Sequence, residues 1–416
     1  MSGTSAMLLG TAAAAIGSYV FQVVGGRALG ADAFASVSVM WTLLFLGFTV
    51  FLIPVEQLII RRLTLGGGRT SAIRDSWRVI GLVVAGATFL AVVFSVVARG
   101  SLLDGDAAFV PVAALMFPLH ALMMVGRGFL AGRGRFVAYG AAVALDSFGK
   151  AGGAVLVALI GLGPVALAWA LILSPITVLI VRPFRAETPG RSSEIGSMLP
   201  RSDRRFMAGF LIATAASQAV LAAGPLVVGA LGASSAAISV FFVTTTLFRG
   251  PMSASYNLLA RILPGLTRRA DAGETATINR LARNLAIAGA AGAVVVGSLA
   301  AVAGPQVVQF LYGQEFRPSV TLAAFAAASV VVGIVGLGTT QVLVGRGDTD
   351  RMAIAWLVAV AAAAIAIVVV QADPTIRVAA GFLVGETVAL VGLTVSAIVP
   401  PRSVDPPHGP GPTASA

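Results

Sequence analysis

The sequence predicts an all-α integral membrane protein, with about twelve transmembrane helices in two pseudo-symmetric six-helix lobes around a central cavity. Three observations predict this fold: the composition, a series of apolar segments and an internal repeat. Of 416 residues, 57% are hydrophobic and 11% charged, whereas a soluble domain carries about 25% charged residues. The 48 glycines suit close packing of helices in lipid.

Each bilayer crossing needs about 20 mainly apolar residues, and the chain supplies twelve such segments. They lie at 5–26, 36–60, 77–98, 108–126, 136–160, 163–181, 206–229, 234–260, 284–304, 319–344, 352–371 and 376–399. The first has no basic residue before Arg27, so it is interpreted as a retained span and not a secretory signal. The segments predict four regions: an N-terminal lobe at 1–181, a cytoplasmic linker at 182–205, a C-terminal lobe at 206–399 and a disordered tail at 400–416.

The basic residues predict the orientation. Loops after even-numbered segments carry 22 of the 28 basic residues, and loops after odd-numbered segments carry four. This asymmetry predicts that both termini are cytoplasmic and that the protein lies in the cell membrane. It also explains the net charge of +11 without a nucleic-acid partner, because the chain has no basic stripe with stacking aromatic residues.

Two pairs of similar strings indicate a repeat. ALGADAFASVSV at 28–39 resembles ALGASSAAISVF at 230–241, and LAGRGRFVAYGAAV at 130–143 resembles LVGRGDTDRMAIAW at 343–356. Each pair connects a segment with the one six later in the same orientation. The chain is therefore predicted to form two parallel halves, with a cavity between them that opens to alternate sides.

The fifth segment carries two opposite charges near the membrane midplane. Asp146 and Lys150, the only lysine, stand four residues apart, so they share a helix face and can pair. A charge at the bilayer centre costs about 2.5–3.5 kcal/mol and faces protein or water. Two interpretations stay open. The pair is a structural bridge, or Lys150 leaves Asp146 to bind a substrate diphosphate while Asp146 takes up a proton or another ion.

Arg249 lies mid-way along the eighth segment, beside Gly250-Pro251, which should kink the helix. No acid stands three or four residues away in sequence. A guanidinium without a helical partner suits bidentate capture of phosphate, so Arg249 is the foremost candidate for substrate binding. The alternative is a structural bridge to an acid of another helix: Asp146, Glu56 or Glu386.

Two more acids are candidates for ion coupling, together with Asp146. Glu56 precedes Arg61 and Arg62 near a predicted cytoplasmic end, where snorkelling into the interface is the simpler explanation. Glu386 lies mid-way along the twelfth segment. It is interpreted as a proton or cation site, or as the structural partner of Arg249.

Three neutral polar residues lie within apolar segments. Gln22 and Gln218 are predicted to line the cavity, with interhelical hydrogen bonding as the alternative. His120 is interpreted as a hydrogen-bonded packing residue beside a kink at Pro118, with titration as the lesser alternative.

Catalytic motifs are missing from the sequence. It contains no GxxxxGK[ST], GxSxG or HExxH string and no cysteine, so we expect no enzyme, no cofactor and no metal centre. Two DxD strings, at 104–106 and 348–350, are interpreted as solvated turns and not as metal sites. A membrane-embedded polysaccharide polymerase would show a large outward loop, and every odd-numbered loop here is short.

Five stretches together resemble the polysaccharide-exporter branch of the multidrug/oligosaccharidyl-lipid/polysaccharide exporter (MOP) superfamily. They are GRALGADAFASVSV (26–39), GRGRFVAYGAAVALDSFGKAGGAVLVALIG (132–161), ARILPGLTRRADAGE (260–274), FLYGQEFRPS (310–319) and LVGRGDTDRM (343–352). The resemblance implies flipping of a polyprenyl-diphosphate-linked oligosaccharide, with glycosyltransferases or a polymerase as pathway partners. Lipid II flippases have fourteen spans and a cationic first helix, so this chain is placed nearer the capsule, O-antigen and exopolysaccharide flippases.

The predicted function is therefore export of a lipid-linked oligosaccharide by alternating access, driven by H⁺, Na⁺ or the membrane potential. Arg249, Lys150, Asp146, Gln22 and Gln218 would bind the substrate within a bilayer of membrane lipids. Two alternatives remain. A multidrug antiporter of the same superfamily should have an acidic, aromatic-lined cavity, whereas the midplane here shows two basic groups and few aromatic residues. A non-transporting component of a glycan-assembly complex would tolerate Arg249→Ala.

Overall fold

The computed structural model describes residues 3–64, 69–185, 201–250, 252, 275–345 and 348–398. These ranges are helical and contain no strand, which confirms the predicted all-α class. The elements are α1 (Gly3–Gly47), η1 (Phe48–Leu52), α2 (Ile53–Thr64), α3 (Arg69–Val97), α4 (Arg99–Leu102), α5 (Phe109–Gly132), α6 (Phe136–Ile160), α7 (Pro164–Leu173), η2 (Ser174–Val181), α8 (Arg201–Ala222), α9 (Gly224–Ala230), the helix Ser235–Gly250, α11 (Thr275–Tyr312), η3 (Gln314–Phe316), α12 (Val320–Gly345), α13 (Thr349–Val369) and α14 (Pro374–Ile398).

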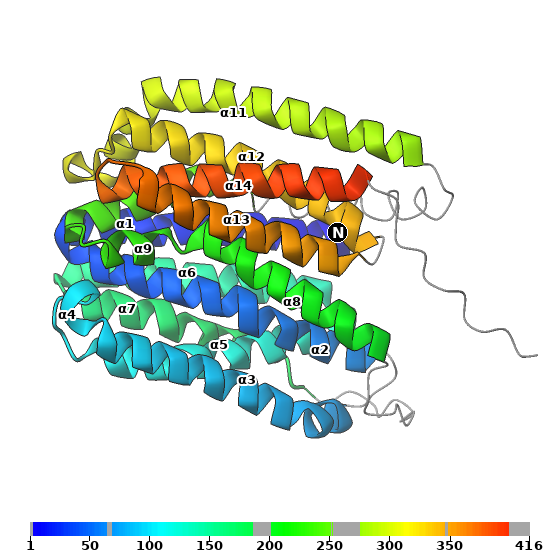
Figure 1. The fold of residues 1–416 in the computed structure, drawn as a ribbon. Helices are drawn as coiled ribbons and strands as arrows, with labels where there is room; N and C mark the ends of the chain where they lie inside the picture. Colours follow the sequence, from blue (N-terminus) through cyan, green and yellow to red (C-terminus); the bar gives the residue numbers. More distant parts are fainter. Residues whose placement is uncertain are drawn as a thin grey trace, which may run out of the picture.

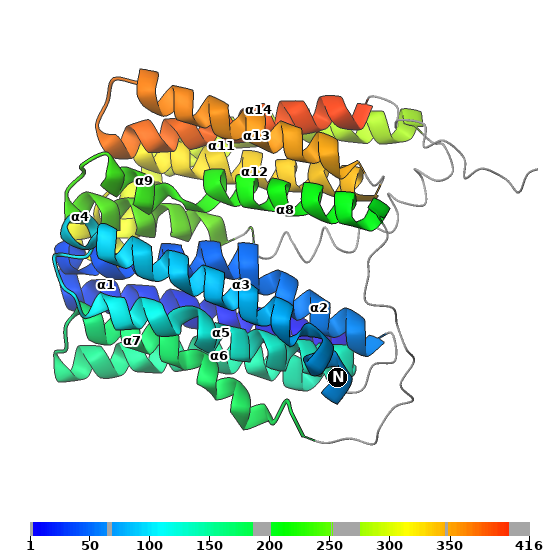
Figure 2. The ribbon, with the colours of Figure 1, turned by 60° about the horizontal axis from the view of Figure 1, so that its bottom comes forward.

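The helices form two bundles, as predicted. Figure 2 shows α1, α2, α3, α5, α6 and α7 in one bundle, and α8, α9, α11, α12, α13 and α14 in the other. In the first, α1 packs on α6 and α5 on α2 and α3, and in the second, α13 packs on α14 and α12 on α11. We call them the N-lobe and the C-lobe. Residues 186–200 of the predicted linker and the whole predicted tail (400–416) lie outside the described residues, and the predicted domain boundaries stay a prediction.

The long helix α1 contains the first predicted span and the beginning of the second, which continues through η1 into α2. The apolar stretch Leu9–Ile60 has 52 residues, and a straight helix of that length would measure about 78 Å, more than twice the bilayer core. Gly30 breaks it with φ 76° and ψ 171°, and Figure 1 shows the N-terminus and α2 at the same end of the molecule. The chain therefore crosses, turns at Gly30 and crosses back.

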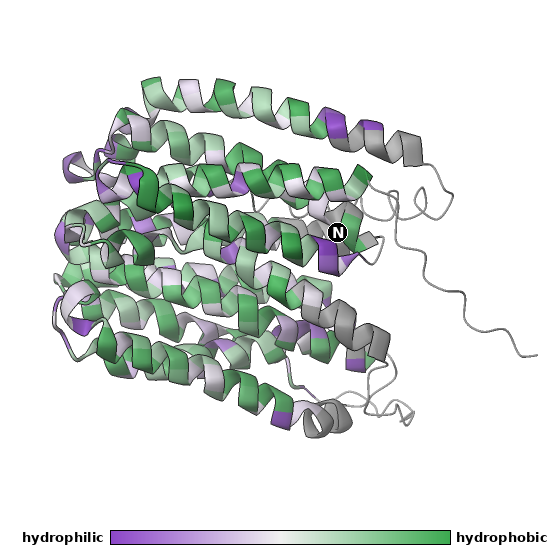
Figure 3. Cartoon of the chain, in the orientation of Figure 1, coloured by the Kyte–Doolittle hydropathy of each residue, from purple (hydrophilic) through white to green (hydrophobic). Residues whose placement is uncertain are grey.

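The other predicted spans also have helical counterparts in the described ranges. Eight single helices besides Leu9–Ile60 are long and apolar enough to cross a membrane, and α8 and α9 form one more span bent by 64°. The shorter apolar helix Ser235–Gly250 occupies the place of the eighth predicted span. The predicted kink at Gly250-Pro251 lies outside the described residues. In Figure 3 hydrophobic residues cover the length of the bundle, which is therefore a multi-pass membrane protein.

The repeat has a structural counterpart at two glycines. Gly30 and Gly232 occupy matching positions of the first repeated string, and they have φ values of 76° and 80°. Glycine adopts positive φ readily because it has no Cβ. In each lobe this turn separates the first helix from the second, as the repeat predicts.

Prolines shape three helices next to the lobe interface. Each lacks the N–H that would bond the carbonyl four residues earlier. Pro54 follows the π-helical segment η1, where the Ile53 N–H bonds the Phe48 carbonyl. Pro175 lies in the 3₁₀ segment η2 that continues α7, and Pro225 lies at the bend between α8 and α9.

Candidate functional site: a charged cavity between the lobes

A cavity of about 390 Å³ lies between the lobes. Its lining comes from α1, η1, α5, α6 and α7 on one side, and from α8, α9 and the helix Ser235–Gly250 on the other. The structure brings together all five predicted substrate-binding residues in this lining: Arg249, Lys150, Asp146, Gln22 and Gln218. Neither Glu56 nor Glu386 is part of it.

Asp146 and Lys150 form the predicted ion pair. The distance from Lys150 Nζ to Asp146 Oδ2 is 2.6 Å, and the Ser174 hydroxyl donates to Asp146 Oδ1 at 2.7 Å. The Lys150 ammonium also lies 6.0 Å from the centre of the Trp41 ring, within cation–π range. Both members of the pair are buried, so its charges are held by side chains of α1, α6 and η2.

A second ion pair corrects two predictions. Glu56 is buried and its Oε2 lies 3.2 Å from an Arg127 guanidinium nitrogen, so the interpretation that Glu56 snorkels into the interface is wrong. Arg127 was assigned to a cytoplasmic loop, but α5 continues to Gly132 and carries Arg127 into the cavity lining. The guanidinium also donates to the Tyr139 hydroxyl at 2.5 Å and lies 4.9 Å from that ring centre.

Arg249 and Glu386 carry opposite charges in the C-lobe. Arg249 lines the cavity, and Glu386 does not. Glu386 is 1% exposed and lies behind the lining, where Ser329 of α12 donates to its Oε2 at 2.5 Å. Its Oε1 has no hydrogen-bond partner among the described residues. Gly333 leaves room beside it, because a Cβ there would lie 3.6 Å from Glu386 Oε2.

His120 and Gln22 add neutral polar groups to the lining. The Nδ1 atom of His120 lies 2.8 Å from the Met116 carbonyl, and the imidazole packs edge-on against Phe48, which agrees with the predicted packing role. Its Nε2 atom has no hydrogen-bond partner in the described part of the chain. Gln22 accepts a hydrogen bond from Tyr312 of the other lobe at 3.5 Å.

The cavity is closed at the end of the molecule where α1 turns at Gly30. Phe34 packs against Phe242 and Phe316 of the C-lobe, and all three are buried. Polar contacts join the lobes around this aromatic layer. Glu315 Oε2 accepts from the Ala31 N–H at 3.0 Å, Asp32 Oδ1 accepts from the Ala236 N–H at 3.1 Å, and Arg27 donates to the carbonyls of Phe310 and Leu311.

A nearby loop residue shares this electrostatic environment. Partial desolvation raises the pKa of the exposed Asp104 carboxyl above its usual range, and the negative charges of Asp32 and Asp106 raise that pKa further. Like charges in proximity disfavour ionisation in this way.

Tyr19 joins the lobes next to Arg249. Its hydroxyl lies 3.1 Å from the Thr246 carbonyl and 3.2 Å from the Leu247 carbonyl. A hydroxyl of the N-lobe therefore donates to two carbonyls near the end of the helix Ser235–Gly250. A Cβ at Gly250 would lie 2.3 Å from the Tyr19 oxygen, and glycine is therefore required for this contact.

Comparisons with known proteins identify the fold. An inward-facing multidrug resistance MATE family transporter of the MOP superfamily matches with 17% identity over 91% of this chain and 93% of that chain, with a TM-score of 0.63. An outward-facing transporter of the same family matches with 16% identity over 95% of each chain and a TM-score of 0.59. A mutant of a Vibrio cholerae MATE transporter matches with 14% identity over 95% of this chain and 94% of that chain, also with a TM-score of 0.59.

The chain therefore has the fold of the MATE transporters of the MOP superfamily. No family model and no curated protein sequence matches it. The predicted superfamily fold is confirmed, and the polysaccharide branch stays a prediction. Within the ranges that the structure describes, no group of three or more His, Asp or Glu side chains is placed to hold a metal ion.

Several site residues were missed from the sequence. Ser174 could have been noticed as a hydroxyl preceding a proline within an apolar segment. Arg127 looked like one of many loop arginines, because the apolar pattern ends just before it. Tyr19 carries no sequence signal that separates it from an ordinary interfacial tyrosine. Its role depends on a carbonyl more than 200 residues away in sequence.

Proposed function

We propose that the protein is an alternating-access flippase for an anionic amphiphile, a polyprenyl-diphosphate-linked oligosaccharide. One observation supports this cargo: in the part of the chain that the structure describes, the cavity lining carries three cations and one acid. Arg127, Lys150 and Arg249 are the cations, and Asp146 is the acid, whereas Glu56 and Glu386 lie outside the lining. A diphosphate entering the cavity would meet more cationic than anionic groups.

The proposed binding step uses Arg249 first. A planar guanidinium suits bidentate contact with a phosphate, and Lys150 would supply a second cation on the opposite wall. Hydroxyl and amide groups of the lining, such as Gln22, Gln218, Ser18, Thr42 and Thr245, would bind the sugar. The lipid tail would stay in the bilayer.

Glu386 is the proposed proton site. When the cargo phosphate binds Arg249, it neutralises a positive charge that would otherwise favour the ionised form of Glu386. The buried Glu386 carboxylate would then take up a proton, because an uncompensated buried charge is costly. Release of cargo would restore the Arg249 charge to Glu386 and expel the proton. This exchange would couple flipping to a proton gradient, and Na⁺ is the alternative ion.

Transport requires that the closed end opens. The aromatic layer at Phe34 and the contacts at Asp32 and Glu315 would separate as the lobes rock. The distribution of arginines predicts that this end faces the outside and that both termini are cytoplasmic. The conformation described here would then receive cargo from the cytoplasmic side, where glycosyltransferases of the pathway would deliver it.

A multidrug antiporter is the second candidate, because the cavity is more aromatic than the sequence predicted. Among the described residues, five aromatic side chains line it: Tyr19, Trp41, Phe45, Phe48 and Phe242. The expectation of few aromatic residues was wrong, because these residues are dispersed over α1, η1 and the helix Ser235–Gly250. Planar organic cations stack on such rings, and the solved relatives are multidrug transporters.

Transport in proteoliposomes distinguishes the two candidates. The purified protein is reconstituted, and flipping of a fluorescent polyprenyl-diphosphate oligosaccharide is compared with uptake of a fluorescent organic cation, each with and without an imposed proton or Na⁺ gradient. We expect flipping of the lipid-linked sugar and no uptake of the cation. Cation transport without sugar flipping would select the antiporter, and the absence of both activities would favour a non-transporting component of glycan assembly.

A further inference from the structure

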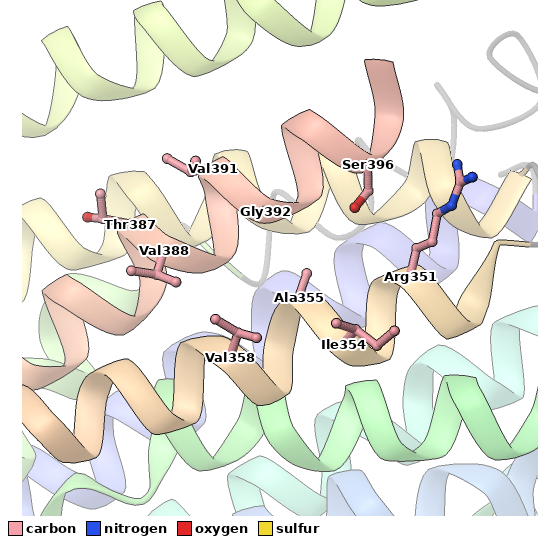
Figure 4. A pocket seen from close by; sticks show the side chains of 9 residues that line it. All are labelled: Arg351, Ile354, Ala355, Val358, Thr387, Val388, Val391, Gly392 and Ser396. Carbon is pink, nitrogen blue, oxygen red and sulfur yellow. The ribbon is translucent and has the colours of Figure 1, made fainter. Parts of the chain in front are cut away.

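A second cavity lies on the outer face of the C-lobe, away from the central one. This outer groove has a volume of about 400 Å³ and runs between α13 and α14 (Figure 4). Its lining is Arg351, Ile354, Ala355 and Val358 of α13 and Thr387, Val388, Val391, Gly392 and Ser396 of α14. None of the residues that line the central cavity belongs to either helix.

Small residues create the groove. A Cβ at Gly392 would lie 3.3 Å from Ala355 Cβ, and one at Gly385 would lie 3.0 Å from the Ala359 carbonyl oxygen. The two helices therefore approach closely at these positions, while larger side chains form the walls. Ile354, Val358 and Val391 are 61%, 53% and 58% exposed, so the groove opens toward lipid and not toward protein.

The lining is apolar except at one end. The Thr387 hydroxyl donates to the Leu383 carbonyl of its own helix at 2.7 Å, and so its hydrogen is satisfied without a ligand. Figure 4 shows Arg351 and Ser396 at the same end of the groove. Arg351 stands in the first turn of α13, which begins at Thr349, and therefore lies at headgroup depth.

The dimensions suit one acyl chain. From Arg351 to Val358 the groove follows α13 for about 10 Å, and from Thr387 to Ser396 it follows α14 for about 14 Å. This span is close to the depth of one leaflet, about 15 Å of a 30 Å core. A polyprenyl chain would extend far beyond it.

We propose that this groove binds an anionic phospholipid, with one acyl chain between α13 and α14 and its phosphate on Arg351. The guanidinium already contacts Asp348 at 3.7 Å. It carries five N–H donors, and a phosphate oxygen would share this guanidinium with its present partners. The proposal concerns a structural lipid and does not depend on the cargo of the central cavity.

Native mass spectrometry of the full-length protein in mild detergent tests the proposal. Equal amounts of phosphatidylglycerol and phosphatidylethanolamine with the same acyl chains are added, and lipid adducts are counted. We expect the wild type to prefer phosphatidylglycerol for its first adduct by about fivefold, the factor that one basic residue contributes near an anionic surface. Arg351→Gln should abolish the preference, and Val358→Trp, which fills the groove, should abolish the first adduct.

Two control variants match these changes. Val368→Trp places the same bulk on an exposed position of α13 that does not line the groove, and Arg283→Gln removes an exposed arginine of α11. Both should bind lipid as the wild type does. Unchanged adducts in Arg351→Gln and Val358→Trp would overturn the proposal. The alternative result is that a polyprenyl phosphate displaces phosphatidylglycerol from the wild type and fails to bind to Val358→Trp. That result would overturn the choice of a phospholipid as the occupant.

Discussion

The two walls of the central cavity hold their charges differently. In the N-lobe, Lys150 bonds Asp146 at 2.6 Å and Arg127 bonds Glu56 at 3.2 Å, and hydroxyls of Ser174 and Tyr139 complete both pairs. In the C-lobe, Arg249 lines the cavity, and Glu386, which is not part of the lining, accepts a hydrogen bond from Ser329. The N-lobe lining therefore contains both members of the Asp146–Lys150 pair, whereas the acid Glu386 of the C-lobe lies outside the lining.

This difference assigns separate roles to the walls. A buried ion pair in direct contact resists separation, because each charge would be left in a low-dielectric environment. The N-lobe pairs should therefore serve the fold first. In the proposed mechanism Arg249 contacts the cargo phosphate, and Glu386 responds by binding a proton.

The largest expected effect comes from breaking one N-lobe network. Arg127→Leu leaves Glu56 as an uncompensated buried charge, which costs about 3–5 kcal/mol. Thermal unfolding of the purified protein should show a large loss of stability. The double variant Glu56→Leu/Arg127→Leu should recover most of it, since no lone charge remains. Equal stability of Arg127→Leu and wild type would show that the network does not hold the fold.

A similar but smaller effect is expected at the other N-lobe pair. Lys150→Met leaves Asp146 with the Ser174 hydrogen bond, and a carboxylate that keeps one donor loses less than an isolated one, about 1–3 kcal/mol. Thermal unfolding measures the loss, and Asp146→Leu/Lys150→Met should reverse it. The flipping rate of this double variant is then compared with that of Arg249→Gln. A rate as low as that of Arg249→Gln would contradict the structural role and show that the N-lobe pair binds cargo as directly as Arg249 does.

Tyr19→Phe weakens the link between the walls. It removes the donor to the Thr246 and Leu247 carbonyls, worth about 1 kcal/mol, and so should favour opening of the lobes. Because the chain has no cysteine, the variant Asp32→Cys/Ala236→Cys reports closure by its rate of disulfide formation. We expect slower formation with Tyr19→Phe. Tyr139→Phe, which alters a contact within the N-lobe, is the control and should leave the rate unchanged.

The smallest effect is expected at the closed end. The raised pKa of Asp104 means that the folded protein holds this proton more tightly than the unfolded chain. The protonated Asp104 carboxyl therefore stabilises the folded protein. This contribution is complete at pH values below the Asp104 pKa of the unfolded chain, and it is lost as the pH rises through the Asp104 pKa of the folded protein. Asp104→Asn should therefore raise the melting temperature slightly at pH 7 and leave it unchanged at pH 3. Asn tolerates the left-handed φ of 52° at this position. A fall in the melting temperature at pH 7 would contradict this sign.

The apolar segments predicted the fold well because hydrophobic length is a local property. The repeat at 28–39 and 230–241 even marked the two turns, since Gly30 and Gly232 share a backbone conformation that favours glycine. Helix ends were harder. Arg127 continues α5 because Glu56 and Tyr139 compensate its charge, and no local pattern reveals partners that far away in sequence.

Part of the site could be predicted because it depends on residues close together in the sequence. Asp146 and Lys150 stand one helical turn apart, so their pairing follows from spacing alone. The positions of Arg249 and Glu386 relative to the cavity depend on how α12, α14 and the helix Ser235–Gly250 pack. The aromatic lining was underestimated because its members come from separate elements, each carrying only one to three of them.

The most direct test of the cationic C-lobe wall compares flipping rates at matched stability. Arg249→Gln, Lys150→Met and the exposed-surface control Arg283→Gln are reconstituted with a fluorescent polyprenyl-diphosphate oligosaccharide, and initial rates are measured under a proton gradient. We predict that Arg249→Gln lowers the rate at least about tenfold, the effect of losing about 1.4 kcal/mol, that Lys150→Met lowers it less, and that Arg283→Gln leaves it unchanged. A stable Arg249→Gln protein that flips cargo at the rate of the control would contradict the assignment of Arg249 as the cargo-binding cation.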